Sequence, residues 1–580
     1  MRRTGPNHAI SHHAIYVETN RRPDSDPPML KKFSTIEETR QRFAWDIPER
    51  FNIGAAICDR WADPEPERLA LIDIDEHGQA RDYSFGTLQA RSNQLANGLC
   101  TLGLEIGTRV AVLLPQRVET ALAHMAILKM GGVSLPLFTL FGPEALEHRL
   151  ADSGVQAIIT DQKNAAPIYK LRDRLPALEH IITVDEGEYG TQRWADLLAW
   201  QSAGFHAVDT RADDPAILIY TSGTTGKPKG ALHAHRVLLG HLPGVDMSHD
   251  FLPQPGDRIW TPADWAWIGG LLDVLMPALY HGVPVVARRF DKFTGEAALD
   301  LIRDYQVQNA FLPPTALKLM RQVPEAERWG INMRSVASGG EALGVELIDW
   351  GQRVLGTTIN EFYGQTECNM IVSSCAALAP PEPGAMGYAV PGHEVAVIDP
   401  DTGRERPVGE EGEIAVRAPN PVMMLEYLNN PQATAEKFVD GPADDHGRRT
   451  RWLKTGDRGK RLASGRFQFI GRDDDVISSA GYRIGPAEIE DCLMRHEAVQ
   501  LAGVVGQPDE LRGQIVTAYI VLAQGYSPSD ALAEDIAQHV KAKLAAYEYP
   551  RVVRFIDQMP MTMTGKIIRA ELRRLASKAD

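Results

Sequence analysis

Short apolar runs alternate with amphipathic stretches over much of the chain. Between residues 50 and 290 the apolar runs fall at 110–114, 157–160, 180–184, 216–220 and 283–287. Stretches with helical spacing, such as 92–102 and 119–130, lie between them. Strands that alternate with helices are typical of layered α/β structure with largely parallel sheets. The same pattern continues to about residue 375 and predicts one large α/β domain.

Two changes of pattern divide the rest of the chain. From about 387 to 470, short β-like runs sit between turn residues, which predicts a small β-rich subdomain, with 440–451 as a charged surface loop. Beyond the polar break at 471–475, Pro486 begins a helix, strands follow, and a second helix starts after Ser529. We therefore expect a disordered extension over 1–30, a large domain over 31–473 and a mobile α+β lid domain over 474–580.

Composition excludes several classes of protein. A chain of 580 residues is too long for one core, and its 44% hydrophobic and 24% charged content is ordinary for a globular protein. A net charge of −15 argues against general binding of nucleic acid. Five cysteines without a CxxC pair fit a reducing compartment, so we expect a cytoplasmic protein. The most apolar stretch, 267–286, is interrupted by charged residues and prolines, so integral membrane association is not expected.

The segment 220–230, Tyr-Thr-Ser-Gly-Thr-Thr-Gly-Lys-Pro-Lys-Gly, follows an apolar run and offers backbone amides, hydroxyls and two lysines. Consecutive amides near glycines form a nest that binds phosphate, so we expect a polyphosphate site. A flexible linker would need neither a preceding strand nor paired lysines. The common nucleotide loop has four residues between Gly and Gly-Lys, whereas two separate Gly223 from Gly226. The P-loop fold is therefore not implied.

Other polar residues are ambiguous when each is taken alone. Glu367 lies in an apolar context and could hold Mg²⁺ beside phosphates, or it could be a solvated loop residue. The turn at 338–342 and Asp457 are equally consistent with ordinary turns. Lys566, near the end of the chain, could be an exposed lysine.

Taken together, these segments resemble the adenylate-forming (AMP-binding) superfamily, and most of all its medium-chain acyl-CoA synthetases. The motifs occur in the family's order and spacing: 220–230, 363–367, 455–457, 471–475, 481–486 and 564–566. The resemblance covers about residues 50 to 575, and 479–490 and 547–551 are most similar to the medium-chain enzymes. It implies that a carboxylate attacks the α-phosphate of ATP and that coenzyme A then displaces AMP from the acyl-AMP.

The resemblance also implies the roles of individual residues. Lys566, Thr366 and Glu367 would be catalytic, Glu367 and Thr224 would bind Mg²⁺, and Asp474 would be the hinge of the lid domain. ATP would be bound by Thr221, Ser222, Gly223, Thr224, Thr225, Gly226, Lys227, Pro228, Lys229, Gly340, Glu341, Ala342, Glu361, Phe362, Tyr363, Gly364, Gln365, Asp457 and Arg472. Coenzyme A would be bound by Ala480, Gly481, Tyr482, Arg512, Lys541, Tyr549, Pro550 and Arg551. The acid would contact Trp265, Trp267, Gly364 and Arg483.

Gly364 bears on the choice of acid. Acetyl-CoA synthetases of the superfamily carry tryptophan at the matching position, so glycine is expected to leave the pocket open for a longer acid. We therefore predict a medium-chain acyl-CoA synthetase of lipid metabolism that uses ATP, Mg²⁺ and coenzyme A. A branched or aromatic acid remains an alternative, as does a homo-oligomeric state. A non-catalytic binding protein on the same fold is disfavoured because Lys566, Glu367 and Asp457 are all present.

Overall fold

The computed structural model describes residues 29–187, 190–221, 228–290, 292–341, 343–443, 447–472, 475–479, 482–509, 512–544, 548–562 and 566–577. Residues 1–28 of the predicted extension lie outside the described residues. Leu30, by contrast, is 3% exposed and packs in a cluster with Met247, Phe251 and Val390. Residues 473 and 474, at the predicted domain boundary and hinge, are also outside the described part of the chain.

The large domain contains two mainly parallel sheets. The first has the order β16-β15-β14-β13-β12-β10-β11-β1-β2. Its strands are β1 (Leu69–Ile74), β2 (Ala80–Ser84), β10 (Ile259–Trp260), β11 (Val285–Arg288), β12 (Asn309–Phe311), β13 (Ser335–Gly339), β14 (Ile359–Gln365), β15 (Asn369–Ser373) and β16 (Tyr388–Ala389). The second has the order β19-β9-β8-β4-β3-β5-β6-β7. Its strands are β3 (Arg109–Leu113), β4 (Val133–Pro136), β5 (Ala157–Thr160), β6 (His180–Thr183), β7 (Gln192–Arg193), β8 (Pro215–Thr221), β9 (Lys229–Ala234) and β19 (Glu426–Tyr427).

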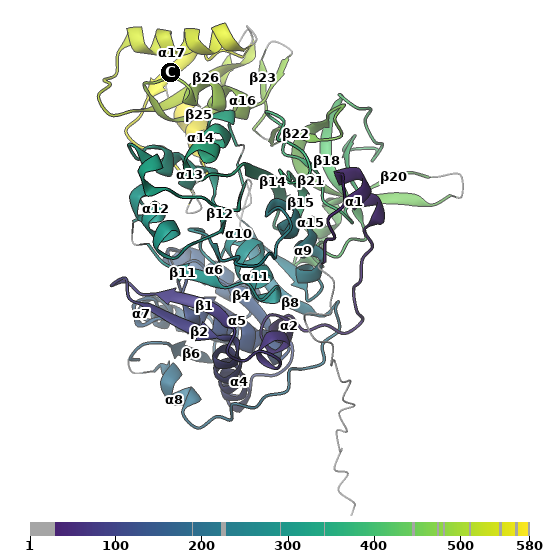
Figure 1. Cartoon of the computed structure of the whole chain (residues 1–580). Helices are drawn as coiled ribbons and strands as arrows, with labels where there is room; N and C mark the ends of the chain where they lie inside the picture. Colours follow the sequence, from purple (N-terminus) through teal and green to yellow (C-terminus); the bar gives the residue numbers. More distant parts are fainter. Residues whose placement is uncertain are drawn as a thin grey trace, which may run out of the picture.

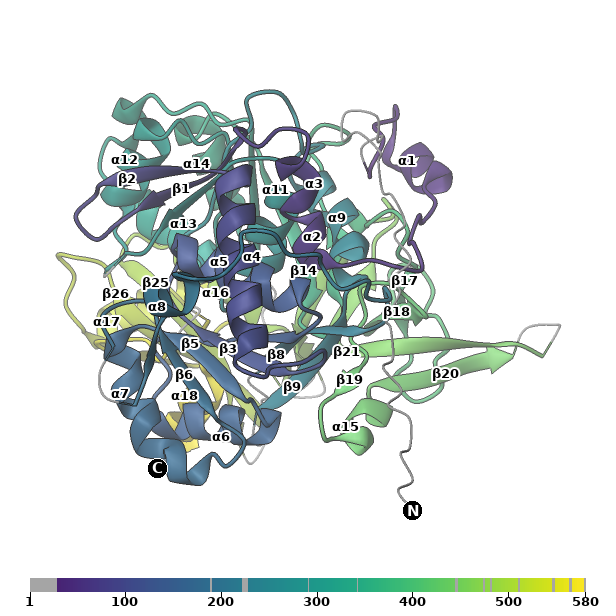
Figure 2. The same ribbon diagram turned by 90° about the horizontal axis from the view of Figure 1, so that it is seen from below.

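Helices cover both faces of both sheets (Figures 1 and 2). The central layer is α4 (Phe85–Thr101), α5 (Val118–Lys129) and α9 (Val237–Ser248), whose apolar residues share one core with β3 of one sheet and β11 of the other. The outer layer on the first sheet is α12 (Gly295–Asp304), α13 (Pro314–Arg321) and α14 (Val345–Val354). The outer layer on the second is α6 (Pro143–Ser153) and α7 (Gln162–Leu171). The predicted α/β layering is confirmed.

Smaller elements complete this domain. They are α1 (Ile36–Arg42), α2 (Ile53–Ala56), α3 (Asp59–Ala62), η2 (Arg172–Arg174), α8 (Trp194–Leu198), α10 (Ile268–Gly270), the π-helical η3 (Leu271–Leu275), α11 (Met276–Tyr280), η4 (Ala326–Trp329) and α15 (Pro431–Glu436).

The predicted β-rich subdomain is a five-stranded antiparallel sheet. Its strands are β17 (Val395–Ile398), β18 (Glu411–Ala418), β20 (Phe438–Ala443), β21 (Arg449–Arg461) and β22 (Phe467–Arg472). The prediction of a loop over 440–451 was wrong, because β20 and β21 pair there with Asp440 opposite Arg451. This hairpin projects from the body of the molecule (Figures 1 and 2). Asp440, Arg449 and Arg451 are exposed, and a glycine and a proline interrupt β20, so the sequence here resembles a surface loop.

The C-terminal domain is α+β, as predicted, and lies at one end of the molecule (Figure 1). Its elements are β23 (Ile477–Ser479), β24 (Tyr482–Ile484), α16 (Pro486–Met494), β25 (Val499–Asp509), β26 (Gly513–Leu522), α17 (Asp530–Lys543), β27 (Val552–Phe555) and α18 (Arg569–Ser577). Helix α17 begins where the Ser529 side chain accepts a hydrogen bond from the Leu532 amide. Ile536 and Val540 of this helix are fully buried against the sheet.

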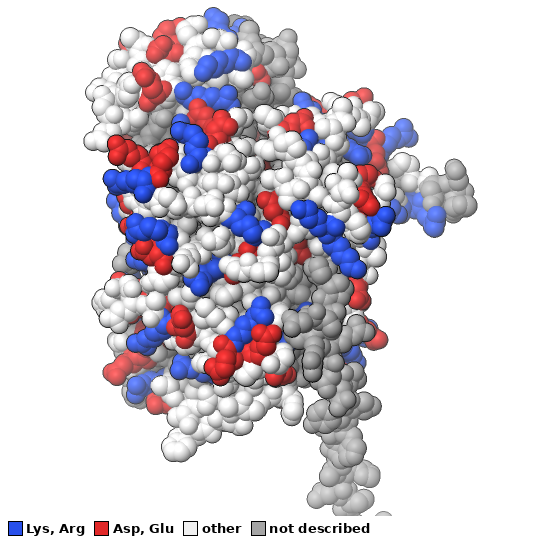
Figure 3. Space-filling view, in the orientation of Figure 1, with Lys and Arg blue, Asp and Glu red and all other residues white. Residues whose placement is uncertain are grey.

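Two surface properties bear on partners. Among the described residues, no helix combines the length and apolar character needed to cross a bilayer. On the face seen in Figure 3, the described Lys and Arg side chains are interspersed with Asp and Glu and form no continuous basic band.

Candidate active site

The hairpin of β14 and β15 presents the predicted catalytic turn. Thr366, Glu367 and Cys368 connect the two strands, with Thr366 half-buried and Glu367 8% exposed. The Glu367 carboxylate accepts a hydrogen bond from the Tyr427 hydroxyl, and its backbone carbonyl accepts one of 2.9 Å from the Met424 amide. The segment around β19 thus fixes both the backbone and the carboxylate of Glu367.

Glu367 fits the single-carboxylate pattern of a magnesium site. Among the described residues, no group of three His, Cys, Asp or Glu side chains is arranged to hold a metal ion. Mg²⁺ commonly takes one or two carboxylates and completes its shell with waters and substrate phosphates. A lone buried carboxylate is therefore sufficient where substrate phosphates supply further ligands. The other predicted ligand, Thr224, lies outside the described residues.

Asp457 joins the β-rich subdomain to β14. Its Oδ2 accepts hydrogen bonds of 2.6 Å from the Tyr363 hydroxyl and 2.6 Å from Gln365 Nε2. Its Oδ1 lies 3.8 Å from Arg472 Nε. Burial raises the pKa of Asp457, while Arg472 and the two donors oppose that rise. The carboxylate thus has one oxygen held by the fold and one on the side of Arg472, which is the arrangement that a bound ribose would need.

Lys566 reaches this site from the C-terminal domain. Its Nζ lies 5.8 Å from the centre of the Trp267 ring. The Gly340 backbone is so close that an ideal Cβ there would lie 3.5 Å from Lys566 Cε. Burial lowers the pKa of Lys566, and Glu341 and Asp457 act against that effect. Three sequence-distant motifs therefore meet at one lysine.

The residues predicted around adenine differ in burial: Gly340 and Glu341 are exposed or half-buried, whereas Glu361 and Phe362 in β14 are buried. Gly340 is exposed, with φ of 96°, and Glu341 lies 3.8 Å from Lys318, whereas Ala342 is outside the described part of the chain. Phe362 is 8% exposed, and its ring centre lies 5.3 Å from that of Phe311, with the two rings tilted by 48°. Glu361 is buried, and its Oε1 accepts a hydrogen bond of 3.3 Å from the Leu343 amide. Burial raises the pKa of Glu361 to about 8, so this carboxyl is mostly protonated at neutral pH.

The two predicted acyl-site tryptophans differ in their surroundings. Trp265 is 1% exposed and belongs to the main hydrophobic core. Trp267 is half-buried, lies 5.8 Å from the Phe311 ring and faces Lys566. Of the pair, only Trp267 borders the lysine. The side chain of Arg483, in β24, is not described.

The expectation that Gly364 leaves open space is wrong in one respect. Gly364 is exposed, but an ideal Cβ on it would lie 1.8 Å from the Asn369 carbonyl oxygen. The strand register shifts between Tyr363 and Gly364, which turns this Cβ direction towards β15 rather than into a pocket. In this structure a side chain at position 364 would therefore displace β15, and the space beside Gly364 is not open.

The predicted phosphate loop is described only at its ends. β8 and β9 pair as far as Thr221 opposite Lys229, and residues 222–227 lie outside the described residues. Lys229 Nζ lies 5.3 Å from the centre of the Tyr427 ring, whose hydroxyl binds Glu367. Tyr427 was missed from the sequence, because a lone tyrosine after an unremarkable turn carries no motif.

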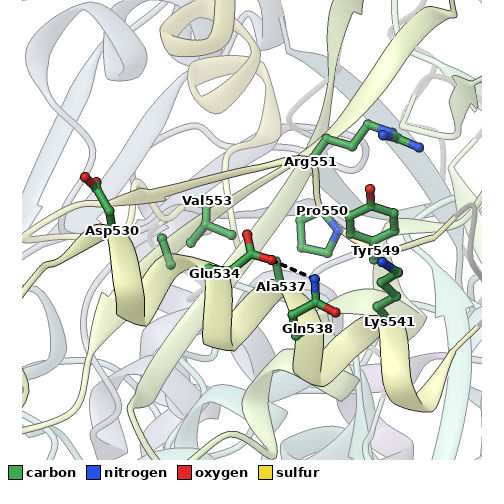
Figure 4. Close-up of a pocket in the computed structure, with 10 residues that line it drawn as sticks. Asp530, Glu534, Ala537, Gln538, Lys541, Tyr549, Pro550, Arg551 and Val553 are labelled. Carbon is green, nitrogen blue, oxygen red and sulfur yellow. Dashed lines mark hydrogen bonds between the residues drawn. The ribbon is translucent and has the colours of Figure 1, made fainter.

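Part of the predicted coenzyme A set lines one pocket of about 460 Å³ (Figure 4). Lys541 Nζ and Arg551 Cζ lie 5.2 Å and 5.0 Å from the centre of the Tyr549 ring, next to Pro550. Arg512 is elsewhere, in the turn before β26, where its amide donates to Asp509. Ala480 and Gly481 are outside the described residues, as is the side chain of Tyr482.

Comparisons with known proteins agree with this arrangement. Residues 58–428 match the family described as AMP-binding enzyme, and residues 488–566 match the AMP-binding enzyme C-terminal domain. The uncharacterized acyl–CoA ligase YtcI of Bacillus subtilis is 34% identical over 88% of this chain and 93% of its own. Acyl-coenzyme A synthetase ACSM2B, mitochondrial, of Homo sapiens is 33% identical over 91% of each chain. The crystal structure of the anthranilate CoA ligase AuaEII with anthranoyl-AMP has a TM-score of 0.81 at 28% identity, covering 92% of this chain and 98% of that one.

Proposed function

Because the chain belongs to the AMP-binding enzyme family and is an AMP-forming acyl-CoA synthetase, we propose that it activates a medium-chain fatty acid. Its substrates are then the acid, ATP and coenzyme A, with Mg²⁺ as the cofactor. The position of Lys566 carries the proposal for the mechanism: a half-buried cation from the C-terminal domain that lies beside Trp267 and Gly340.

In the first half-reaction a carboxylate oxygen of the acid attacks the α-phosphorus of ATP. A new P–O bond forms, the bond to the bridging oxygen breaks, and pyrophosphate leaves with that electron pair. Lys566 contacts the carboxylate and the α-phosphate, Thr366 donates to the same phosphate, and Asp457 with Arg472 holds the ribose. Glu367 would hold Mg²⁺, which would supply charge neutralisation at the phosphates. Positioning and charge stabilisation are the main requirements of such a transfer.

In the second half-reaction the thiolate of coenzyme A attacks the acyl carbon. The thioester bond forms and AMP leaves with its phosphate oxygen. Lys541, Tyr549 and Arg551 support binding of coenzyme A, since the pocket that they line brings two cations to one aromatic ring (Figure 4). Because Lys566 must leave the site before the thiol enters, the C-terminal domain rotates about residues near Asp474.

Two observations support different acids. The similarity to a human acyl-coenzyme A synthetase and the segment 479–490 favour a medium-chain fatty acid. The row of Trp267, Phe311 and Phe362 and the similarity to an anthranilate CoA ligase favour an aromatic acid as the second candidate. A branched short-chain acid is a weaker alternative, which no feature of the site favours.

A panel of acids decides between these candidates. Straight-chain acids from acetate to dodecanoate, isobutyrate, benzoate and anthranilate are each given to the enzyme with ATP, Mg²⁺ and coenzyme A. We expect kcat/KM to rise about threefold to fourfold for each added methylene until the pocket is filled, because each buried methylene contributes about 0.8 kcal/mol. A maximum with benzoate or anthranilate would replace the medium-chain proposal by the aromatic one.

A cytoplasmic location remains part of the proposal, supported by the five cysteines, none of which forms a disulfide in the described part of the chain. A homo-oligomeric state is left open, since the site described above is built from one chain.

A further inference from the structure

Helix α6 contacts both ends of the phosphate loop. His148 Nε2 lies 3.0 Å from the carbonyl oxygen of Pro228, just after the loop. The Tyr220 hydroxyl, just before the loop, donates a hydrogen bond of 2.6 Å to Asp152 Oδ2. Because a carbonyl oxygen only accepts, His148 must be the donor in its bond. The two α6 residues are four positions apart, which places them on the same face of the helix.

The same helix is also hydrogen-bonded to the segment after β19, the strand that contains Tyr427. The carbonyl oxygen of Asp152 accepts a hydrogen bond of 2.8 Å from Asn429 Nδ2. Asn429 lies two residues after Tyr427, whose hydroxyl binds the Glu367 carboxylate. The amide of Leu428, between them, donates at 2.8 Å to the Gly230 carbonyl. One helix therefore contacts the phosphate loop on both sides and the segment that supports the proposed metal ligand.

Helix α6 is itself firmly placed. It begins with Pro143 at its first turn and ends at Gly154, whose φ of 58° stops the helix. Leu146 and Leu150 are buried in the core beneath the second sheet. The Arg149 guanidinium lies 4.0 Å from the Phe141 ring, close enough for a cation–π contact. α6 and α7 lie together on the outer side of the sheet (Figure 2). A rigid helix can hold a loop in one geometry more precisely than the β8–β9 hairpin alone.

We propose that His148 and Asp152 are positioning residues for ATP, which hold the two ends of the phosphate loop at the separation that the β- and γ-phosphates require. This inference rests on the proposed function, in which the loop binds those phosphates. Neither side chain touches the nucleotide; each acts through the backbone or side chain of a loop-end residue. The bond to Asp152 has a charged acceptor, which makes it the stronger of the two.

The two half-reactions separate this role from general stability, because thioester formation from acyl-AMP does not involve the β- and γ-phosphates. The variants are His148→Leu, Asp152→Leu and Tyr220→Phe, with His148→Gln and Asp152→Asn as versions that keep a donor or an acceptor. Glu147→Gln is the matched control, since Glu147 is on α6 but pairs with Arg174 at 2.9 Å. ATP binding is measured by calorimetry. The first half-reaction is followed by pyrophosphate release from ATP, and the second by thioester formation from supplied acyl-AMP.

We expect His148→Leu, Asp152→Leu and Tyr220→Phe each to raise Kd and KM for ATP about tenfold, because each variant loses one hydrogen bond of this kind. Thioester formation and the Glu147→Gln control should stay at the wild-type level, and His148→Gln should recover most of the affinity. Unchanged ATP affinity, or an equal loss in both half-reactions, would overturn the proposal. If the wild type binds ATP but releases no pyrophosphate with any acid, the proposed function fails, and the binding measurements still decide the role of α6.

Discussion

Gly344 and Asp491 lie in different domains and are in direct contact. An ideal Cβ on Gly344 would lie 1.9 Å from Asp491 Oδ1, so the carboxylate occupies the space that any other residue's side chain would need. Gly344 immediately precedes α14 of the large domain, and Asp491 is in α16 of the C-terminal domain. An acidic group at the start of a helix is favourable. The contact helps to seat the C-terminal domain in the arrangement that brings Lys566 to Trp267.

Replacement of Gly344 by alanine should therefore impair acyl-AMP formation, the first half-reaction. The added methyl group displaces Asp491, and a small displacement of Lys566 is expected to slow acyl-AMP formation about 10- to 100-fold. Thioester formation from supplied acyl-AMP should be unaffected, because in the proposed mechanism the C-terminal domain has rotated before that step. Gly142→Ala is the matched control: Gly142 also precedes a helix, and a Cβ there meets nothing within 4 Å. Equal activity of the Gly344→Ala variant and the wild type in adenylation would refute the role of this contact.

Lys566→Ala should abolish the first half-reaction selectively. Loss of this half-buried cation, which in the proposed mechanism lies at the site of developing charge, is expected to slow acyl-AMP formation about 100- to 1,000-fold. The second half-reaction, started from supplied acyl-AMP, should keep most of its rate. Single-turnover measurement of each step tests the prediction. A similar loss in both steps would mean that Lys566 acts in folding or domain packing and not at the α-phosphate.

The pH dependence of the first step should report the same lysine. Burial lowers the pKa of Lys566, so its positive charge is lost at a lower pH than that of an exposed lysine. The alkaline limb of kcat/KM for ATP, which reports the free enzyme, should accordingly fall below the usual range of lysine. In Lys566→Arg the remaining activity should persist to higher pH, because arginine stays protonated. An alkaline limb that is identical in the two enzymes would assign the titration to another group.

Gly364→Ala should reduce the stability of the protein rather than alter its preference among acids. Its Cβ would overlap the Asn369 carbonyl, so we expect the free energy of unfolding to fall by about 1–3 kcal/mol. Thermal unfolding measures the loss, and Gly204→Ala, at an exposed loop glycine with room for a methyl group, is the control. Stability equal to the wild type, together with a preference for shorter acids, would restore the interpretation that Gly364 lines the acyl pocket.

The sequence predicted the architecture well where periodicity and end signals were strong. Ala157–Thr160 forms a strand at the predicted bounds, and α16 starts at Pro486 as expected. The hairpin of β20 and β21 was missed, because exposed charged strands resemble loops. The motif order predicted that Lys566, Asp457 and Gly340 share one site, and in the structure Lys566 lies beside Gly340 and is influenced by the charge of Asp457.

Contacts between side chains of distant elements could not be predicted. Tyr427 bonds to Glu367 across 60 positions, and Asp152 to Tyr220 across 68, although neither Tyr427 nor Asp152 belongs to a motif. The shift of register at Gly364 depends on the geometry of a bulge. Glycine permits such a bulge, but its presence in the sequence does not predict one. Such features follow from the packing of whole elements and not from local spacing.

The central claim is that the chain joins an acid to coenzyme A through acyl-AMP. The most direct measurement incubates the enzyme with ATP, Mg²⁺, coenzyme A and the acid panel, and quantifies AMP, pyrophosphate and acyl-CoA. The account predicts equal amounts of the three products, highest with a medium-chain acid, and acyl-AMP in place of acyl-CoA when coenzyme A is omitted. Formation of ADP instead of AMP, or no product with any acid, would contradict it.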